Sequence, residues 1–190
     1  MSTKRRLPQA ESRLAALAAA REVLLEHGPQ AVTLKAVASR IGRTHANLLH
    51  HFGSASGLQK ALTEYLAKDI CATIGEAVAA TREGAGSPRA VVDLIFDAFE
   101  EGRGLMAWLL LSGDDEALAP VIEEITRLVA RFEDLDRARE VSLLLTVMAM
   151  GDAQIGGRLS ASLALPRDTA RDSAERILRG ALERTRADRG

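Results

Sequence analysis

Three of the chain's four histidines lie within seven positions of the segment IGRTHANLLHHFGS, residues 41–54. Imidazoles can bind metals, transfer protons or donate hydrogen bonds, so the spacing of His45, His50 and His51 decides which chemistry is open to them. Metal ligands on one helix converge at spacings of three or four residues, whereas these histidines lie five, six and one apart. Their side chains therefore diverge around a helix axis, and no Cys, Asp or Glu nearby completes a site. We predict no metal and no cofactor.

Two short helices are expected to position these histidines. Thr33 is a suitable N-cap for a first helix that ends at Gly42, and Thr44 is a suitable N-cap for a second. Apolar residues recur at i, i+3, i+4 and i+7 in the first helix, and at i, i+4 in the second. These are Leu34, Val37, Ala38 and Ile41, then Leu48 and Phe52. A short helix, a tight glycine turn and another short helix make a helix-turn-helix.

The second of these helices turns a small and polar surface outward. If Leu48 and Phe52 pack inward, the opposite side carries Ala46 and His50, flanked by Asn47 and Leu49. No Asp or Glu occurs from residue 28 through residue 63. Such a surface suits a polyanionic groove, because imidazole and amide groups can donate to phosphate oxygens or base edges. The partner expected from these residues is double-stranded DNA.

Charge is divided unequally along the 190 residues, although the net charge is only −1. Residues 1–66 hold nine Lys and Arg against four Asp and Glu, a balance of +5, while residues 67–190 hold sixteen against twenty-two, a balance of −6. Asymmetry between the two parts indicates that the first third meets a polyanion. The segment MSTKRRLP at the start adds a basic arm, which we take as residues 1–10.

The whole chain is expected to be helical. Ala and Leu dominate, aromatic residues make up 3%, and no segment alternates with period two. Expected helices cover about 11–27, with Leu14, Leu17 and Leu24 on its apolar face, then 56–80, 88–101, 118–133, 136–160 and 167–186. The longest apolar runs are about half of the ~20 residues that cross a bilayer, and no basic-then-apolar leader opens the chain. With the single cysteine, Cys71, this predicts a cytoplasmic protein without membrane contact.

The segment TLKAVASRIGRTHANLLHHFGSASGLQKAL, with the helix before it, resembles the N-terminal domain of the TetR family of transcriptional regulators. The family pattern of a threonine, a helix, a glycine turn and a recognition helix that ends near His-Phe is matched by Thr33, Gly42, Thr44, Leu48, His51 and Phe52. Arg43 stands in place of the usual aliphatic residue of the turn, Leu49 in place of a tyrosine, and Ala55 in place of a lysine. The resemblance covers about residues 11–66.

The resemblance implies a helix-turn-helix domain at 11–55 and a ligand-binding and dimerisation domain at 56–190. Asn47 is the expected base reader, since its amide can pair with adenine in bidentate fashion, and His45 or His50 is next in line. Thr44 and His51 are expected to hold phosphates. The complete predicted DNA-binding set is Thr33, Arg43, Thr44, His45, Ala46, Asn47, Leu49, His50, His51 and Lys60.

In the second domain the resemblance implies a homodimer and a pocket for a small apolar ligand. Small and apolar residues on the last two long helices predict the dimer interface: Leu144, Gly151, Ile155, Ala174, Ile177, Leu178 and Ala181. Large or adaptable side chains of the central helices predict the pocket lining: Phe96, Phe99, Met106, Trp108, Leu110 and Met148, with Asp152 as a polar anchor. Either set could instead be ordinary internal core.

The predicted function is therefore a ligand-responsive repressor that binds an inverted-repeat operator as a homodimer. An enzyme is not expected, because the chain has no GxSxG motif, no phosphate loop and no histidine beyond residue 66 to activate a serine. An interaction module of the same fold, with weak or lost DNA binding, stays open as the alternative, given the departures at Arg43, Leu49 and Ala55.

Overall fold

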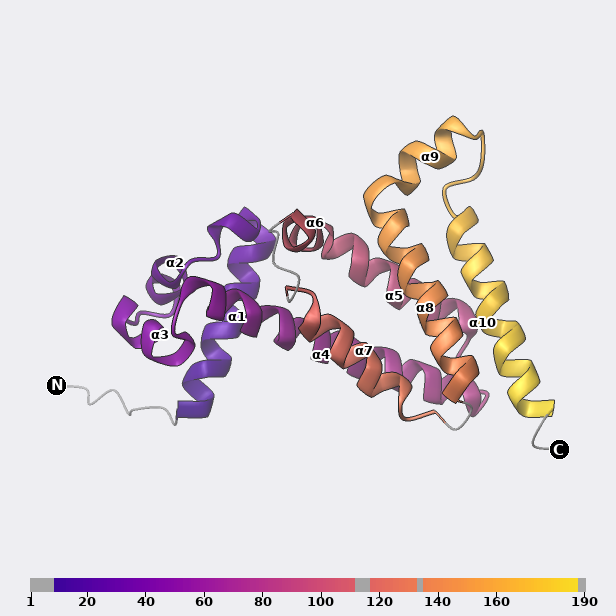
Figure 1. Cartoon of the computed structure of the whole chain (residues 1–190), viewed down its shortest axis with the longest axis horizontal. Coiled ribbons are helices and arrows are strands. Elements are labelled where there is room, and N and C mark those ends of the chain that lie inside the picture. Colours follow the sequence, from indigo (N-terminus) through magenta and orange to yellow (C-terminus); the bar gives the residue numbers. More distant parts are fainter. Residues whose placement is uncertain (1–8, 112–116, 133–134, 188–190) are drawn as a thin grey trace. The chain divides into compact units, whose positions relative to one another are not determined.

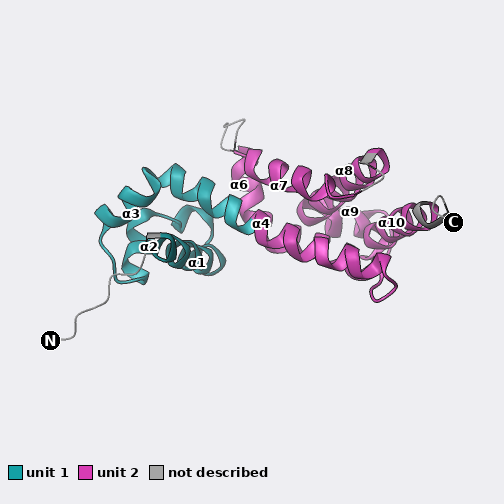
Figure 2. Ribbon diagram, turned by 90° about the horizontal axis from the view of Figure 1, so that it is seen from below, with its two compact units in different colours: residues 1–66 teal, residues 67–190 magenta. Residues whose placement is uncertain are grey.

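The structure, a computed structural model of the chain, describes residues 9–111, 117–132 and 135–187. Helices account for all regular secondary structure in these residues, and they form two compact units, residues 1–66 and 67–190 (Figures 1 and 2). The predicted all-α fold is confirmed. The basic arm lies almost wholly outside the described residues.

The N-terminal unit contains α1 (Gln9–His27), the short 3-10 turn η1 (Pro29–Ala31), α2 (Leu34–Arg40), α3 (His45–Phe52) and the start of α4 (Ala55–Arg82). Gly28 ends α1 with φ 80, a conformation that glycine adopts without steric cost. The core is built from Ala16, Leu17, Ala19, Ala20 and Val23 of α1 with Val32, Leu34, Val37, Ala38, Leu48, Phe52, Leu58, Ala61 and Leu62. Leu14 was expected on this face but is 55% exposed, because alanines and Val23 line the buried side of α1 instead.

The second unit contains the rest of α4, α5 (Pro88–Glu101), α6 (Arg103–Leu111), α7 (Ala119–Val129), α8 (Leu135–Gly151), α9 (Gly157–Ser162) and α10 (Thr169–Ala187). The helix expected at 136–160 is continuous but not uniform, since a π turn, η2 (Asp152–Gly156), joins α8 to α9. The core gathers α5, α8 and α10 around Phe96, which is 1% exposed.

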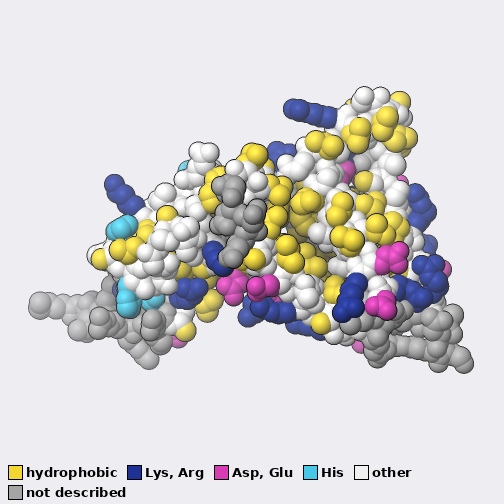
Figure 3. Space-filling view, viewed as in Figure 1, with side chains coloured by type: hydrophobic (Ala, Val, Ile, Leu, Met, Phe, Trp, Pro, Cys, Tyr) yellow, Lys and Arg dark blue, Asp and Glu magenta, His cyan; other side chains and the backbone are white. Residues whose placement is uncertain are grey.

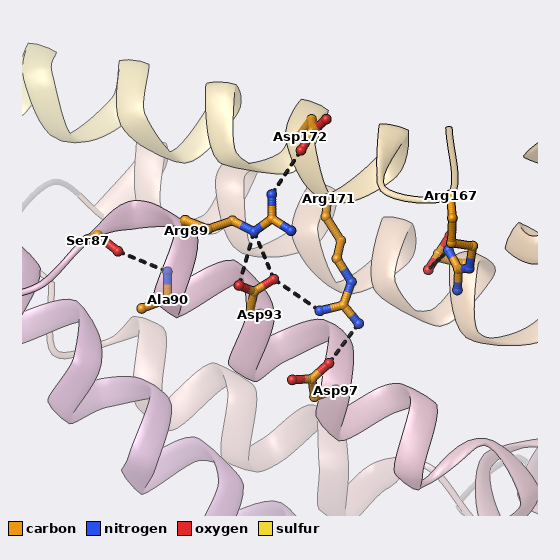
Figure 4. Close-up of polar contacts among 9 residues, drawn as sticks. Ser87, Arg89, Ala90, Asp93, Asp97, Arg167, Arg171 and Asp172 are labelled. Carbon is orange, nitrogen blue, oxygen red and sulfur yellow. Dashed lines mark hydrogen bonds and ion pairs between the residues drawn. The ribbon is translucent and has the colours of Figure 1, made fainter. Parts of the chain in front are cut away.

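Ion pairs connect α10 to α5 at the edge of this core (Figure 4). Arg89 donates to Asp93 of its own helix and, at 2.9 Å, to Asp172 of α10. Arg171 of α10 donates to Asp93 at 3.0 Å and to Asp97 at 2.7 Å. The Arg171 guanidinium also lies 5.2 Å from the centroid of the Phe96 ring. Three carboxylates and two guanidiniums thus form one network, which favours a single register between α5 and α10.

Candidate nucleic-acid interface

The turn between α2 and α3 is a Schellman motif. Gly42 has φ 62, its N–H donates to the carbonyl of Ser39, and the N–H of Arg43 donates to the carbonyl of Ala38 at 2.9 Å. These bonds satisfy the last carbonyls of α2 and fix the direction in which the chain leaves it. The predicted glycine turn is confirmed, and Arg43 is half-buried in it.

Threonine hydroxyls cap both helices of the motif, as predicted. Thr33 Oγ1 accepts from the N–H of Ala36 at 3.1 Å, and Thr44 Oγ1 accepts from the N–H of Asn47 at 3.2 Å. Each bond satisfies a backbone donor that would otherwise be free at a helix start. Both threonines remain exposed, so their hydroxyls lie at the protein surface.

The predicted division of α3 into two sides is confirmed by burial. Leu48 is 0% exposed and Phe52 8%, and both belong to the core of the N-terminal unit. The exposed residues of the helix are His45 in its first turn and then Ala46, Leu49 and His50, and we call these four the outer face of α3. Histidine side chains are visible at the surface of this unit in Figure 3. His51 is half-buried beside it, and Lys60 of α4 is exposed.

Asn47 departs from the simple expectation for a base reader. The residue is half-buried, and its Oδ1 atom is buried without a hydrogen-bond partner. Bidentate pairing with adenine needs this oxygen as the acceptor and the amide nitrogen as the donor. The side chain must therefore rotate before it can make that pair.

Two arginines that sequence reasoning missed organise the helices around α3. Arg40 of α2 donates to Glu22 at 3.2 Å and to both carboxylate oxygens of Glu26 on α1. The hydrogen bond from Arg40 lowers the pKa of the Glu26 carboxyl group. Arg13 of α1 reaches α3, where it donates to the carbonyl of His51 at 3.0 Å. An arginine at a given helix position carries no sequence signal for a contact 38 residues away.

The predicted pocket residues lie in different environments. Phe96 is core, and Phe99 and Met148 pack against the same cluster. Met106 and Trp108 are half-buried, while Leu110 is 50% exposed. The side chain of Asp152 is 6% exposed and accepts from Arg167 at 2.7 and 2.8 Å.

The predicted dimer residues divide into two groups. Leu144, Gly151 and Ile155 are exposed, and Ile177 is half-buried. Ala174, Leu178 and Ala181 are at most 7% exposed. These three side chains are therefore already covered by their own chain, whereas the first group is accessible to a partner. Val147 and Leu159, missed in the sequence, are 53% and 50% exposed.

Leu144, Val147, Gly151, Ile155 and Leu159 follow one another at spacings of three or four residues, and we call them the apolar stripe. Figure 3 shows hydrophobic side chains gathered at the surface over α8 and α9. In the part of the chain that the structure describes, no group of three or more His, Cys, Asp or Glu side chains is arranged to hold a metal ion. Among the same residues, no helix is both long and apolar enough to cross a membrane.

The two capped helices α2 and α3, joined by the turn at Gly42, form a helix-turn-helix, the motif with which many proteins enter the major groove of DNA. Residues 16–62 match the family model described as bacterial regulatory proteins, tetR family. This segment of the chain is thus similar to the DNA-binding domain of tetR-family regulatory proteins.

Solved structures share the fold. A TetR-family transcriptional regulator from Streptomyces coelicolor is 22% identical, with a TM-score of 0.56 over 93% of this chain and 98% of that one. A protein with unknown function from Rhodococcus sp. RHA1 is 20% identical, with a TM-score of 0.59 over 95% of this chain and 98% of that one. The search of curated proteins found no match.

Proposed function

We propose that the protein is a ligand-responsive repressor that binds an inverted-repeat operator as a homodimer. The observation that carries the DNA-binding half of this proposal is the outer face of α3. It consists of His45, Ala46, Leu49 and His50, it is exposed on a short capped helix, and the surrounding segment 28–63 contains no carboxylate. A recognition helix that enters the major groove needs these properties, since a carboxylate there would repel phosphates.

Within this proposal, the residues around α3 have two roles. The outer face and Asn47 meet base edges, with Asn47 rotating to pair with adenine. Thr33, Arg43, Thr44, His51 and Lys60 hold phosphates and fix the register, since hydroxyls, cations and imidazoles are common donors to phosphate oxygens. The preference for one DNA sequence would then depend on the few side chains that contact bases. The affinity for DNA of any sequence would depend on all the side chains that contact phosphates.

The apolar stripe supports the homodimer. Contiguous exposed apolar surface on a soluble protein marks an interaction site, and a stripe along one helix fits the same stripe of a second copy related by a two-fold axis. Gly151 in its middle has no atom within 4 Å of the position of a Cβ, so a partner helix can approach closely there. Two copies of α3 would then meet two half-sites, which makes the operator an inverted repeat.

A small apolar ligand is proposed to bind among α5, α6 and α8. Phe99, Met106, Trp108 and Met148 are half-buried, and methionine in particular adapts to varied shapes. Phe96 and Asp152 already have partners, so they support the pocket walls in this proposal. The ligand would release DNA by binding more tightly to the conformation that does not fit the operator.

Selection from random double-stranded DNA, followed by mobility shift at low and high salt, tests the proposal. We expect an inverted-repeat motif whose binding weakens with salt, because phosphate contacts release counterions. Affinity without any selected motif would contradict the recognition role of α3. Absence of binding at every salt concentration would instead support an interaction module that has kept the fold, for which the exposed Leu49 is an apolar contact.

A further inference from the structure

Arg13 connects the first helix of the N-terminal unit with the end of the recognition helix. Its Nη1 atom donates to the carbonyl oxygen of His51 at 3.0 Å, and its guanidinium carbon lies 4.8 Å from the centroid of the Phe52 ring. We propose that Arg13 is a positioning residue that fixes the orientation of α3 for sequence-specific DNA binding. This inference rests on the proposed role of α3 in reading DNA.

The first reason is the identity of the group that Arg13 contacts. The last four carbonyls of a helix lack partners within the helix, and α3 ends at Phe52, so the His51 carbonyl is one of them. The Leu49 carbonyl accepts from the N–H of Gly53 at 2.7 Å, and the His51 carbonyl accepts from Arg13. A cation at the C-terminus also interacts favourably with the helix dipole. Arg13 therefore caps α3 from a different helix.

The second reason is the small number of anchors that α3 possesses. The helix has eight residues, which is too short to be stable alone, and it buries only Leu48 and Phe52. Its backbone packs mainly on α2, and α2 in turn packs on α1. The Arg13 side chain, in contrast, connects α1 to α3 directly, without α2 in between. It holds the end of α3 that carries His50, one residue before the bonded carbonyl.

The third reason is that these two contacts of Arg13 point into the protein. One Nη atom donates to a backbone oxygen, and the guanidinium carbon lies over the ring of Phe52, a residue that is 8% exposed. An arginine held in this way differs from one that binds a phosphate. Removal of a phosphate contact reduces the salt dependence of DNA binding, whereas removal of a positioning contact reduces sequence preference and leaves the salt dependence unchanged.

The experiment compares Arg13→Met and Arg13→Lys with the wild-type full-length chain. Methionine keeps an apolar stem near Phe52 without charge or donor, and lysine keeps the charge without the planar fork. Arg21→Met is the matched control, because Arg21 is exposed on the same helix. Each variant is taken through selection from random DNA, through binding to the selected operator and to random DNA across a salt series, and through helical circular dichroism.

For Arg13→Met we expect the ratio of operator affinity to random-DNA affinity to fall about tenfold, which is the loss of one charged hydrogen bond. The salt slope and the affinity for random DNA should match the wild type. Arg13→Lys should recover part of the ratio, and Arg21→Met should keep all of it. If Arg13→Met does not fold, Arg13→Lys carries the test, with a reduced ratio at an unchanged slope as the expected result.

Two outcomes overturn the inference alone. A slope reduced by about 0.9 with an unchanged motif would show that Arg13 binds a phosphate. A wild-type motif with a wild-type ratio in both variants would show that α3 is held without Arg13. A wild-type chain that selects no motif would overturn the proposed function together with the inference, so the two failures are distinguishable.

Discussion

At the scale of single residues, α3 combines exposed imidazoles with one buried amide oxygen, Asn47 Oδ1, that lacks a hydrogen-bond partner. His45 and His50 are free to meet DNA in the conformation described, whereas the Asn47 oxygen is buried and unsatisfied. An unsatisfied buried acceptor costs roughly 1–3 kcal/mol. Adenine offers that oxygen a donor, so DNA binding can release this cost, and Asn47 has an energetic reason to rotate outward.

Asn47→Ala is expected to weaken binding to the preferred operator by about 1–3 kcal/mol and to flatten the preference at one position of each half-site. The free protein should unfold at an equal or higher temperature, because the unsatisfied oxygen is removed. Selection from random DNA and thermal unfolding measure the two effects. His51→Ala is the comparison variant, and it should weaken all sequences nearly alike. An equally sharp motif for Asn47→Ala would make His45 or His50 the base reader.

Cys71 gives a second residue-scale prediction. Its side chain is buried in α4, and burial, reinforced by the Glu124 carboxylate, raises the pKa of the thiol from 9.0 to about 11. Thiolate is the reactive form, and at pH 8 it is about one part in a thousand of the thiol. We expect native protein at pH 8 to react slowly with iodoacetamide and urea-unfolded protein to react quickly, as followed by mass spectrometry. Equal rates would contradict the buried position.

The same pKa shift predicts a pH dependence of stability. Because the folded pKa lies above the unfolded one, the unfolded thiol ionises first as the pH rises. The stabilising contribution is complete below about pH 9 and is lost as the pH rises toward 11. Between pH 9 and pH 11, the free energy of unfolding of Cys71→Ala, measured by urea titration, should therefore fall less than that of the wild type. Parallel losses in both proteins would show that the thiol does not contribute.

At the scale of elements, the approach of α4 to the end of α3 depends on a glycine. A Cβ at Gly57 would lie 2.0 Å from the carbonyl oxygen of Phe52, and a backbone atom cannot move aside as a flexible side chain can. Ser54 precedes α4 and caps it, with its Oγ accepting from the N–H of Gly57 at 3.0 Å. The first turn of α4 is thus packed against the last turn of α3.

Gly57→Ala is expected to lower the free energy of unfolding by about 1–3 kcal/mol, because the overlap must be relieved by a backbone shift. The sharpness of the selected DNA motif should fall as well. Gly75→Ala in the same helix is the control: its Cβ would meet side-chain atoms alone, Leu128 Cδ1 at 3.0 Å and Arg131 Nη1 at 3.8 Å. There the better helix propensity of alanine offsets a small side-chain movement. Urea unfolding that ranks the two variants equally would contradict the close approach.

How far the sequence predicts this structure depends on the range of the interaction. Thr33, Thr44 and Gly42 act on neighbours within five residues, so their caps and turn could be predicted from residue type alone. The exposure of Leu14, the burial of Ala174 and the contact of Arg13 depend on packing between distant segments, which the spacing of apolar residues does not encode. The π turn was missed because an additional residue in a helix leaves the surrounding apolar pattern nearly unchanged.

At the scale of the whole molecule, the predicted homodimer makes DNA recognition depend on the apolar stripe. One eight-residue helix buries little surface, so specific affinity requires two copies on one operator. Gly151→Arg is expected to give monomers by light scattering with unchanged helical circular dichroism, because the space around Gly151 is open. Specific DNA binding should be lost with the dimer.

The control for this prediction is Ile122→Arg on α7, where an apolar side chain that is not part of the stripe is 59% exposed. We expect this variant to remain dimeric and to bind the operator as the wild type does. Monomers from Ile122→Arg, or dimers from Gly151→Arg, would place the interface elsewhere.

The π turn at Asp152–Gly156 has a consequence for the comparison of related sequences. A π turn accommodates one residue more than an α-helix would, and it leaves the helix on either side in its original register. An insertion of one residue can therefore persist here without disturbing the packing of α8 or the orientation of α9. Relatives with a regular helix should align with a one-residue gap between Asp152 and Gly156. An ungapped alignment would shift every later position by one and pair buried residues of α10 with exposed ones.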